Sequence, residues 1–390
     1  MASFNRRTLL RAGGGLATVV AAGGGVAGLT NLARALADDR GAGADELRVG
    51  YLPITDAAPL LIAHGDGIYQ QQRLTVARPV LFRSWAALAE AFLTRQIDIV
   101  HILMPMGIQL RASVGADARL VSWNHTGGGA VTVRPDLVEL GEIAGTQFAI
   151  PGWWSIHSTL LQRMLRASGL TPVVRRTPRA DRGEVELIVM GPSDMIPALA
   201  NASISGYTVA DPFNAAGEVQ GIGRIHTFLD EVWEDHACCV NVVHQDLIDR
   251  DPDTVQAFTD SIVDAQLRIR DDREIAAEVL STGGAFGDDG YLPQPLPAIT
   301  ASMAGDIEAT GRPRIDFQPY PFPSFSAELV RQMEQTLVDG DTAFLDRISP
   351  ETIHDEFADV SFVRRSLERA GGPRAFGLPA DLTREERILL

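Results

Sequence analysis

The loop Trp153-Trp154-Ser155-Ile156-His157 carries the side chains best suited to holding a small solute. It follows a predicted strand, Gln147 to Ile150, and opens an amphipathic helix expected from Ser155 to Ser168. With Ser155 as N-cap, free backbone N–H groups and the positive end of the helix dipole adjoin two indole rings. Such a loop suits a small oxyanion or an aromatic ring. The alternative is that the tryptophans are structural and His157 is a polar surface residue.

Three further loops follow predicted strands and are expected to face the same space. They carry Thr55 and Asp56 after the strand Leu47–Tyr51, Met104 and Pro105 after the strand Ile97–Ile102, and Asp211, Phe213 and Asn214 after the strand Ile204–Ala210. Ligands of parallel α/β sheets bind beyond the carboxyl ends of the strands, often between lobes. For Thr55, Asp56 and Asp211, capping of the next helix is the alternative role.

The sequence lacks the motifs of common enzyme classes. It has no G-x-S-x-G elbow, Walker loop, G-x-G-x-x-G fingerprint after a strand, or H-E-x-x-H motif, and its eight histidines are scattered. We therefore expect a protein that is not an enzyme, with no catalytic residue, metal or cofactor assigned. Glu231, Glu234, Asp235 and His236 could bind a cation, but an exposed acidic loop is the simpler interpretation.

The two cysteines, Cys238 and Cys239, are adjacent, and no other thiol exists to pair with either. A disulfide between neighbouring residues strains the peptide that joins them. The pattern Ala-Cys-Cys-Val-Asn-Val-Val is typical of a buried strand in which cysteine acts as a small apolar residue. A redox or metal-binding role is the alternative.

Charge and composition narrow the function classes. The formal net charge is -16 over 390 residues, which argues against nucleic acid or an anionic membrane as a partner. All 34 basic residues are arginine, so Schiff-base chemistry on lysine is excluded.

Residues 1–37 resemble a twin-arginine signal peptide. Arg6-Arg7 precedes a mildly apolar, glycine-rich stretch from Ala12 to Leu29, and Ala35-Leu36-Ala37 provides a cleavage site. We therefore expect a periplasmic or extracytoplasmic protein. The alternative is that the segment stays as a membrane anchor. No cysteine follows the apolar stretch, which excludes lipid attachment as a lipoprotein.

Strands and helices alternate along the remaining chain, which predicts an α/β fold of two lobes with mostly parallel sheets. The expected elements include a strand over 74–81 and helices over 84–95, with Ser84 as N-cap, over Gly107–Ser113 and over Ala327–Asp339. The expected order is a first part of lobe 1 over 38–128, lobe 2 over 129–237, a return to lobe 1 over 238–340, and a helical C-terminal extension over 341–390. Gly127 to Gly129 provide the first crossing between lobes, with a hairpin turn as the alternative.

Several stretches resemble the solute-binding proteins of ABC importers in the nitrate, sulfonate, taurine and bicarbonate group. The similar stretches are R-V-G-Y-L-P-I-T-D-A-A-P-L (48–60), H-I-L-M-P-M (101–106), I-S-G-Y-T-V-A-D-P-F-N-A (204–215) and D-F-Q-P-Y-P-F-P-S-F (316–325). The resemblance is nearest to the nitrate- and bicarbonate-binding branch. It implies a type II periplasmic-binding fold, a ligand held between lobes, and delivery to a membrane permease.

The sequence departs from that branch in two ways. The branch uses a lysine near the anion, and this chain has none, so an arginine, His157 or backbone donors must serve. The loop P-G-W-W-S-I-H also differs from the phenylalanine-rich version of the branch. A bicarbonate binder of the family uses calcium, so an acidic residue facing the site could pair with a metal.

These observations predict an exported, monomeric solute-binding protein. Its small ligand is expected to be an oxyanion or organic acid of the nitrate, bicarbonate or sulfonate type, held by lobe closure. The alternatives are a binder of a pyrimidine precursor or another heteroaromatic ring, and an enzyme resembling pyrimidine synthases that use histidine and cysteine around iron.

Overall fold

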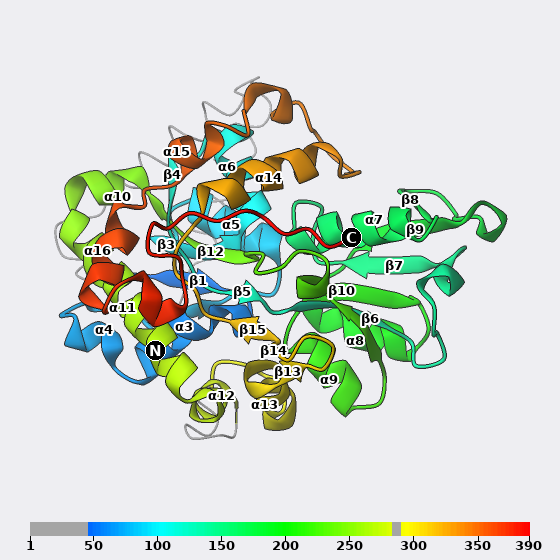
Figure 1. Ribbon diagram of the computed structural model, residues 1–390, viewed down its shortest axis with the longest axis horizontal. Helices are drawn as coiled ribbons and strands as arrows, with labels where there is room; N and C mark the ends of the chain where they lie inside the picture. The colour runs from blue at the N-terminus through cyan, green and yellow to red at the C-terminus, as the bar shows by residue number, and fades with distance from the viewer. Residues whose placement is uncertain (1–45, 283–289) are drawn as a thin grey trace, which may run out of the picture.

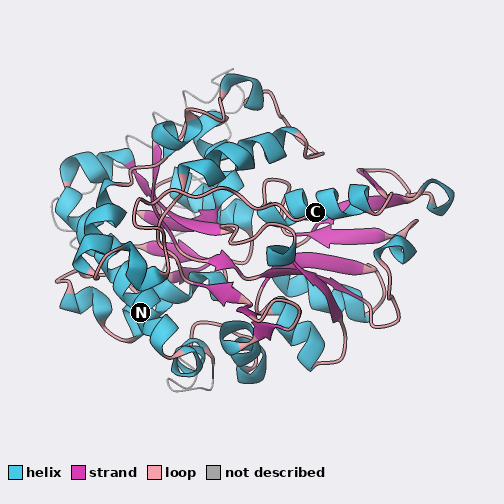
Figure 2. Ribbon diagram, viewed as in Figure 1, coloured by secondary structure: helices cyan, strands magenta, loops and turns pink. Residues whose placement is uncertain are grey.

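Two lobes, each built on one β-sheet with flanking helices, make up the computed structural model (Figures 1 and 2). The structure describes residues 46–282 and 290–390, so the predicted signal segment lies outside the described residues. Within these ranges, no helix has both the length and the apolar character needed to cross a membrane.

The sheet of lobe 1 has the strand order β2-β1-β3-β12-β4. Its strands are β1 (Val49–Tyr51), β2 (Val80–Leu81), β3 (Ile99–Leu103), β4 (Ala118–Trp123) and β12 (Cys239–His244). Flanking helices are α3 (Ala58–Gly65), α4 (Ile68–Gln71), α5 (Trp85–Leu93), α6 (Met104–Ala112), α10 (Gln245–Arg250), α11 (Pro252–Asp271), α12 (Arg273–Leu280) and α13 (Leu296–Ala304). Strand β12 follows all the strands of lobe 2 in the sequence. In space it lies between β3 and β4 in the sheet of lobe 1.

The sheet of lobe 2 has the order β11-β6-β10-β7-β9-β8. Its strands are β6 (Gly129–Val133), β7 (Gln147–Ile150), β8 (Thr171–Val173), β9 (Glu184–Val189), β10 (Gly206–Ala210) and β11 (Arg224–Phe228). Helices α7 (Ile156–Ala167), α8 (Pro192–Ala200) and α9 (Phe213–Val219) pack against it.

Short extended segments connect the lobes. Strand β5 (Thr126–Gly127) pairs with β15 (Ile315–Asp316), and Thr126 also pairs with Ala237. Beside them lies the hairpin of β13 (Asp306–Ile307) and β14 (Arg312–Pro313). Gly127 and Gly128 have φ values of 68° and 79°, which glycine adopts at little cost.

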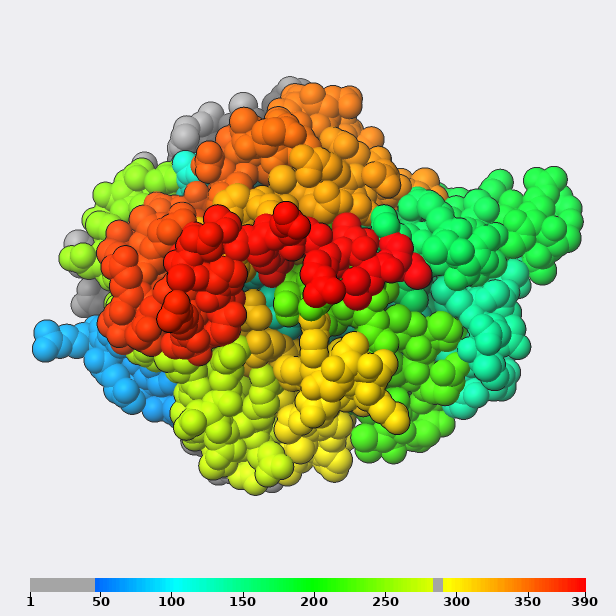
Figure 3. All heavy atoms as spheres, in the orientation of Figure 1, coloured from blue at the N-terminus to red at the C-terminus, as the bar shows by residue number. Residues whose placement is uncertain are grey.

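The C-terminal part adds α14 (Pro323–Glu334), α15 (Ile353–Phe357) and α16 (Ser361–Arg369) to lobe 1, and then a tail. Figure 3 shows this tail crossing the face of the molecule from lobe 1 toward lobe 2. Arg384 places its guanidinium over the rings of Trp123, Phe322 and Phe325, and the side chain of Arg163 in α7 donates to the carbonyl of Leu390. The tail therefore touches both lobes.

The predicted α/β class is confirmed. Most strand pairings in the two main sheets are parallel, but each sheet also contains antiparallel pairings. Strands joined by βα units pair in parallel, as β1 does with β2 and β3, whereas β6 and β12, which follow the crossings between lobes, are antiparallel to their neighbours. A chain that enters a sheet from the other lobe is free of the crossover helix that imposes the parallel direction.

Several element boundaries differ from the sequence prediction. Helix α6 begins at Met104 rather than Gly107, because Pro105 suits a first helical turn and the N–H of Met104 donates to Cys238 O. The strand expected over 74–81 is reduced to β2 and a bridge from Val76. Helix α14 begins at Pro323, although the sequence suggested Ala327.

Candidate functional site

A buried group of polar side chains lies where the two lobes meet. Asp56, His125, Cys238 and Cys239 bring their side-chain ligand atoms within 4.8 Å of one another, and all four residues are 0–1% exposed. His101, His157 and His236 are also buried and interact electrostatically with Asp56. Four of the eight histidines thus gather around one carboxylate. We refer to these seven residues as the polar cluster.

Neighbouring elements of both lobes bring the polar cluster together. Asp56 lies in a short 3₁₀ turn, Thr55–Ala57, directly after β1. His125 follows β4, and the cysteines lie at the start of β12, which pairs with β4. His157 comes from lobe 2, in the first turn of α7. Ser155 is the N-cap of α7, because its Oγ accepts from Ser158 N at 3.0 Å and donates to Gly152 O at 2.7 Å.

A network of side-chain amides binds the backbone of the Asp56 loop and of its neighbour Asn124. Asn124 Nδ2 donates to the carbonyl of Asp56, and Asn241 Nδ2 donates to Asn124 Oδ1 at 2.9 Å. Gln266 Nε2 in α11 donates to the carbonyl of Asn124 at 2.8 Å. These buried bonds fix the backbone on both sides of the cluster, which leaves the Asp56 and His125 side chains preoriented.

Asp56 and His125 form a buried ion-pair contact. Asp56 Oδ2 lies 2.9 Å from His125 Nε2. Burial alone would raise the pKa of the Asp56 carboxyl, but the His125 imidazole, helped by His101 and His157, lowers it. Burial would also lower the pKa of His125, but Asp56 outweighs it and raises that pKa. The pair is therefore charged at neutral pH.

The other three histidines are neutral. Burial lowers the pKa of His157 to about 4, partly opposed by Asp56, and burial lowers the pKa of His101 and of His236 to about 3. A neutral imidazole offers one donor and one acceptor. Both ring nitrogens of His157 lack hydrogen-bond partners among the described residues. Buried polar atoms are nearly always partnered, so these atoms are available to a bound molecule.

Arg314 provides a cation at the edge of this region. Its Nη2 donates to Glu218 Oε2 at 3.2 Å, whereas its buried Nε and Nη1 have no partner among the described residues. It also interacts electrostatically with Asp211, whose pKa burial raises to about 6. The sequence analysis left an arginine, His157 or backbone donors to replace the absent lysine of the nitrate and bicarbonate binders, and Arg314 is an arginine close to this region.

The structure places the predicted site residues in two environments. Thr55, Asp56 and His157 lie at the polar cluster, and Met104 adjoins it through the bond from its N–H to Cys238 O, with Pro105 next in the helix. The predicted capping role of Thr55 and Asp56 is wrong, because neither side chain caps α3 and the Thr55 hydroxyl has no partner within the described chain.

Asp211, Phe213 and Asn214 are committed to contacts within lobe 2 and to the lobe boundary. Asp211 O accepts from Thr55 N at 2.8 Å, and Asp211 Oδ1 accepts from Ala215 N. The carbonyl of Phe213 accepts from the Tyr207 hydroxyl. Asn214 donates to Val209 O and accepts from Thr132. Both ends of the Asn214 amide are thus occupied.

Trp153 and Trp154 line a different cavity, an apolar pocket of about 350 Å³ between the lobes. Its walls include Trp85 in α5, Met106 in α6 and Pro192 in α8. The Trp154 ring packs on Phe344 with ring centroids 5.1 Å apart. Because α6 begins at Met104 beside Cys238 and α7 carries His157, the first turns of these two helices separate this pocket from the polar cluster.

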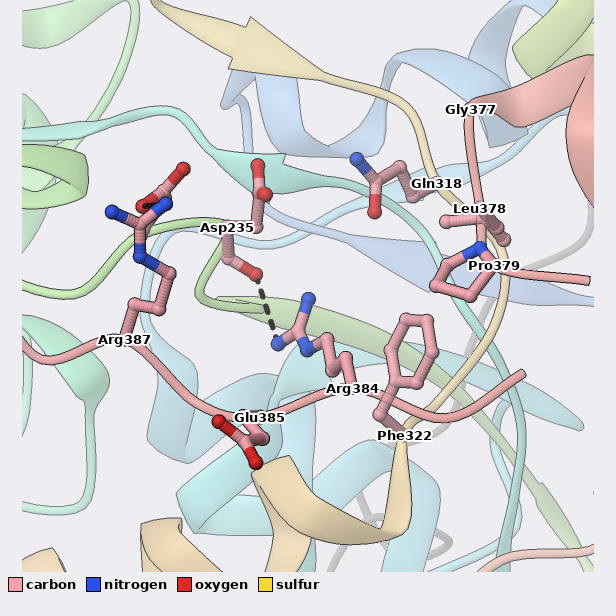
Figure 4. Close-up of a pocket in the computed structure, with 10 residues that line it drawn as sticks. Asp235, Gln318, Phe322, Gly377, Leu378, Pro379, Arg384, Glu385 and Arg387 are labelled. Carbon is pink, nitrogen blue, oxygen red and sulfur yellow. Dashed lines mark hydrogen bonds and ion pairs between the residues drawn. The ribbon is translucent and has the colours of Figure 1, made fainter. Parts of the chain in front are cut away.

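The acidic stretch 231–235 is part of an ion-pair network rather than an exposed loop. Arg312 pairs with Asp230 and Glu234, and Arg387 pairs with Glu234 at 2.9 Å. A pocket of about 190 Å³ opens here under the C-terminal tail, where Arg384 donates to the Asp235 carbonyl (Figure 4). His236 is fully buried and faces the polar cluster instead.

Sequence reasoning did not select His101, His125 or Arg314. It gave His236, Cys238 and Cys239 a cation- or metal-binding role only as an alternative. One signal could have found three of them. His125 directly precedes the glycine run predicted as the first crossing, and the cysteines lie at the predicted return to lobe 1. Residues at two crossings between the same lobes must lie close together, whatever their separation in sequence.

The profile of the NMT1-like family matches residues 40–282. This chain belongs to that family. It is 25% identical over 242 residues to a nitrate/nitrite binding protein of a Nostoc species, and the alignment covers 56% of this chain and 52% of that protein. The chain thus spans about half the length of the first curated relatives it matches.

Solved structures agree in fold. The periplasmic nitrate-binding protein from Synechocystis aligns with a TM-score of 0.69 at 17% identity, covering 87% of this chain and 91% of that one. A zinc-containing ligand-binding component of an ABC-type import system from Staphylococcus aureus aligns with a TM-score of 0.66 at 22% identity, covering 83% and 99%. These structures are of the periplasmic-binding-protein type, and at these identities the likeness concerns the fold alone.

Proposed function

We propose that this chain is an extracytoplasmic solute-binding protein of an ABC importer that encloses a small oxyanion or organic acid between its lobes. It acts as a monomer without catalysis and delivers the solute to a permease. The nitrate-, bicarbonate- and sulfonate-type ligands are the candidates, and export by the twin-arginine route is part of the proposal. Membership of the NMT1-like family and the nitrate-binding relatives support this class.

One observation carries the proposal: Thr55 of lobe 1 and His157 of lobe 2 face the same buried region without hydrogen-bond partners there. Gly128 and Gly129 at the crossing lie against the loops that carry these residues. A Cβ on Gly128 would lie 3.4 Å from Oδ1 of Asp56, the neighbour of Thr55 in sequence, and one on Gly129 would lie 2.9 Å from His157 Nε2. A solute that accepts from both lobes stabilises their contact, which is how binding would drive closure.

The test is binding of nitrate, nitrite, bicarbonate and taurine to the full chain purified without denaturation, measured by calorimetry and thermal shift. We expect one of them to bind at one site per chain. Thr55→Val and His157→Ala should each weaken that binding by about 10- to 100-fold, since each removes a hydrogen bond to a charged ligand. His354→Asn, which changes a buried histidine outside the polar cluster, should leave affinity unchanged. If none of the four anions binds, the oxyanion assignment is lost.

A ring ligand is the second candidate, favoured by the apolar pocket beside Trp153 and Trp154. Its signature would be tight binding of a pyrimidine-like ring that quenches tryptophan fluorescence and is weakened by Trp153→Ala but not by Thr55→Val. An anion bound at the polar cluster should show the opposite pattern, because His157 lies in the first turn of α7 at the polar cluster, whereas Trp154 precedes the N-cap Ser155 and lines the apolar pocket.

A further inference from the structure

We propose that Asp56, His125, Cys238 and Cys239 form a site for one divalent transition-metal ion of the zinc class, set in the wall of the solute region. The sequence analysis favoured apolar strand residues for the cysteines, with a redox or metal-binding role as the alternative, and named neither a metal nor its other ligands. None of the comparisons assigns these residues a role. The inference goes beyond the proposed solute-binding function, and its test needs no solute.

The spacing of the ligand atoms fits a tetrahedral site. The carboxylate oxygen, the imidazole nitrogen and the two sulfurs all lie within 4.8 Å of one another. The two sulfurs are 3.7 Å apart. Two thiolates at the usual Zn–S distance of about 2.3 Å and a tetrahedral angle would lie about 3.8 Å apart. The cysteines therefore need almost no adjustment to hold the ion together.

The backbone at the cysteines explains how adjacent residues can share one ion. Successive side chains within a strand point to opposite faces of the sheet. Cys238 precedes β12, which begins at Cys239, and its carbonyl accepts from Met104 N at 2.9 Å. The pair thus straddles the end of the strand, where the alternation does not hold, and both sulfurs reach Asp56 and His125.

The contacts of Asp56 leave room for a cation. Both of its oxygens are buried, and neither makes a hydrogen bond within the described residues, although Oδ2 lies 2.9 Å from His125 Nε2. That nitrogen is also 3.2 Å from the amide nitrogen of Cys239, and one ring nitrogen cannot accept from the amide and donate to the carboxylate at once. Buried charges are paired with good geometry or coordinate metals, and here the pairing is incomplete.

The donor set selects the class of metal. Two thiolates, one imidazole and one carboxylate suit zinc and cobalt(II), whereas calcium and magnesium prefer six or more oxygen ligands. An iron–sulfur cluster is held by four cysteines, or by two cysteines and two histidines in the Rieske type, and this set of two cysteines, one histidine and one aspartate matches neither. Binding releases to solvent the two thiol protons and the extra proton of the His125 imidazolium, and it changes no oxidation state. Since all four ligands are buried where the two lobes meet, the ion would enter when the lobes separate.

The experiment uses the full chain, reduced and stripped with a chelator, then titrated with zinc or cobalt(II) in the absence of any candidate solute. We expect one ion per chain. Cobalt should give a thiolate-to-metal charge-transfer band together with the visible bands of a tetrahedral ion. Cys238→Ser with Cys239→Ser should abolish that band and weaken zinc binding by at least about 100-fold.

Two further variants test the role of Asp56 as a ligand and provide a control outside the polar cluster. Asp56→Asn should weaken the zinc affinity but keep the charge-transfer band, because both sulfurs remain. His354→Asn should change neither the zinc affinity nor the charge-transfer band.

Three outcomes would each refute the site: a reduced protein that binds no zinc, a cobalt form without the thiolate band, or an unchanged affinity in the double cysteine variant. The band is measured on the unmodified chain, so the proposal stays testable even if the double variant fails to fold. Anion binding is measured separately, so either proposal can fail without the other.

Discussion

Single residues far apart in sequence form the polar cluster because the strands that carry them are neighbours in space. His101 lies on β3 and His125 follows β4, and β12, which starts at Cys239, pairs with both strands. Thr55, Asp56 and His157 could be selected from the sequence, since each directly follows a predicted strand or opens a helix. His101 could not, because its proximity to Asp56 depends on where β12 inserts. His125 and the cysteines could be brought together only by comparing the two predicted crossings between the lobes.

Gly129→Ala tests how tightly the crossing holds His157. A Cβ there would lie 2.9 Å from His157 Nε2 and 3.0 Å from Leu229 Cδ1. We expect His157 to be displaced, with a loss of stability of about 1–3 kcal/mol from overpacking and weaker solute binding. Gly141→Ala is the control, because no atom lies within 4 Å of its added Cβ and its φ is not positive. Urea unfolding and calorimetry give both quantities. Equal behaviour of the two variants would contradict this account.

His244 should make stability depend on pH in the acid range. Its ring stacks on Phe92 with centroids 3.8 Å apart, and burial, assisted by Arg95 and opposed by Asp246 and Asp98, lowers its pKa to about 4. The unfolded chain, with an ordinary pKa near 6.5, binds the proton first. Stability is thus lost as pH falls from about 6.5 to 4, by up to about 3 kcal/mol from this residue.

His244→Phe keeps the stacking and removes the titration. Its free energy of unfolding, measured in urea at several pH values, should fall less steeply between pH 6.5 and 4 than that of the unmodified chain. His101, His157 and His236 are also buried and neutral, so part of the slope should remain. An unchanged slope would show that His244 does not contribute.

At the scale of elements, sequence patterns predicted helices with clear caps and failed where tertiary bonds set the boundary. Helix α7 runs over Ile156–Ala167 behind its N-cap Ser155, close to the predicted Ser155–Ser168. Ser84 caps α5 as expected. In contrast, α6 begins three residues earlier than predicted, because the carbonyl of Cys238, more than 130 residues away, accepts from the N–H of Met104. No local pattern contains that bond.

The two serine caps allow a direct comparison. Ser155→Ala should cost about 1–2 kcal/mol, because the buried hydroxyl makes two bonds that position the first turn of α7. Ser84→Ala should cost less, since its single bond to Ala87 N is 3.3 Å long and solvent-exposed. Denaturant midpoints measure both. If Ser155→Ala were the milder change, the cap could not be what holds His157 in place.

At the scale of the molecule, the succession of lobes follows from βα alternation, but the contacts that fix how the lobes meet do not. Helix α13 packs against α9 across the lobe boundary through Ala298, Ala215 and Ala216 (Figure 1). Arg314 and Glu218 form an ion pair nearby. Small residues at such a contact let the helices approach closely, and alanines on two separate helices carry no sequence signal that they touch.

Ala298→Leu should shift the protein toward separated lobes. Ala298 is fully buried, and three added carbon atoms cost about 1–3 kcal/mol where there is no free space. Because the α9–α13 contact lies across the lobe boundary, separating the lobes would break it. The cost therefore falls on the arrangement with the lobes together, and the apparent affinity for solute should drop in proportion to the population of that arrangement. Small-angle scattering should show a larger radius of gyration than for the unmodified chain, and added solute should partly reverse the change.

The control is Ala87→Leu, at an exposed position of α5, which should scatter and bind as the unmodified chain does. If Ala298→Leu behaved like Ala87→Leu, the α9–α13 contact would not control how far the lobes close.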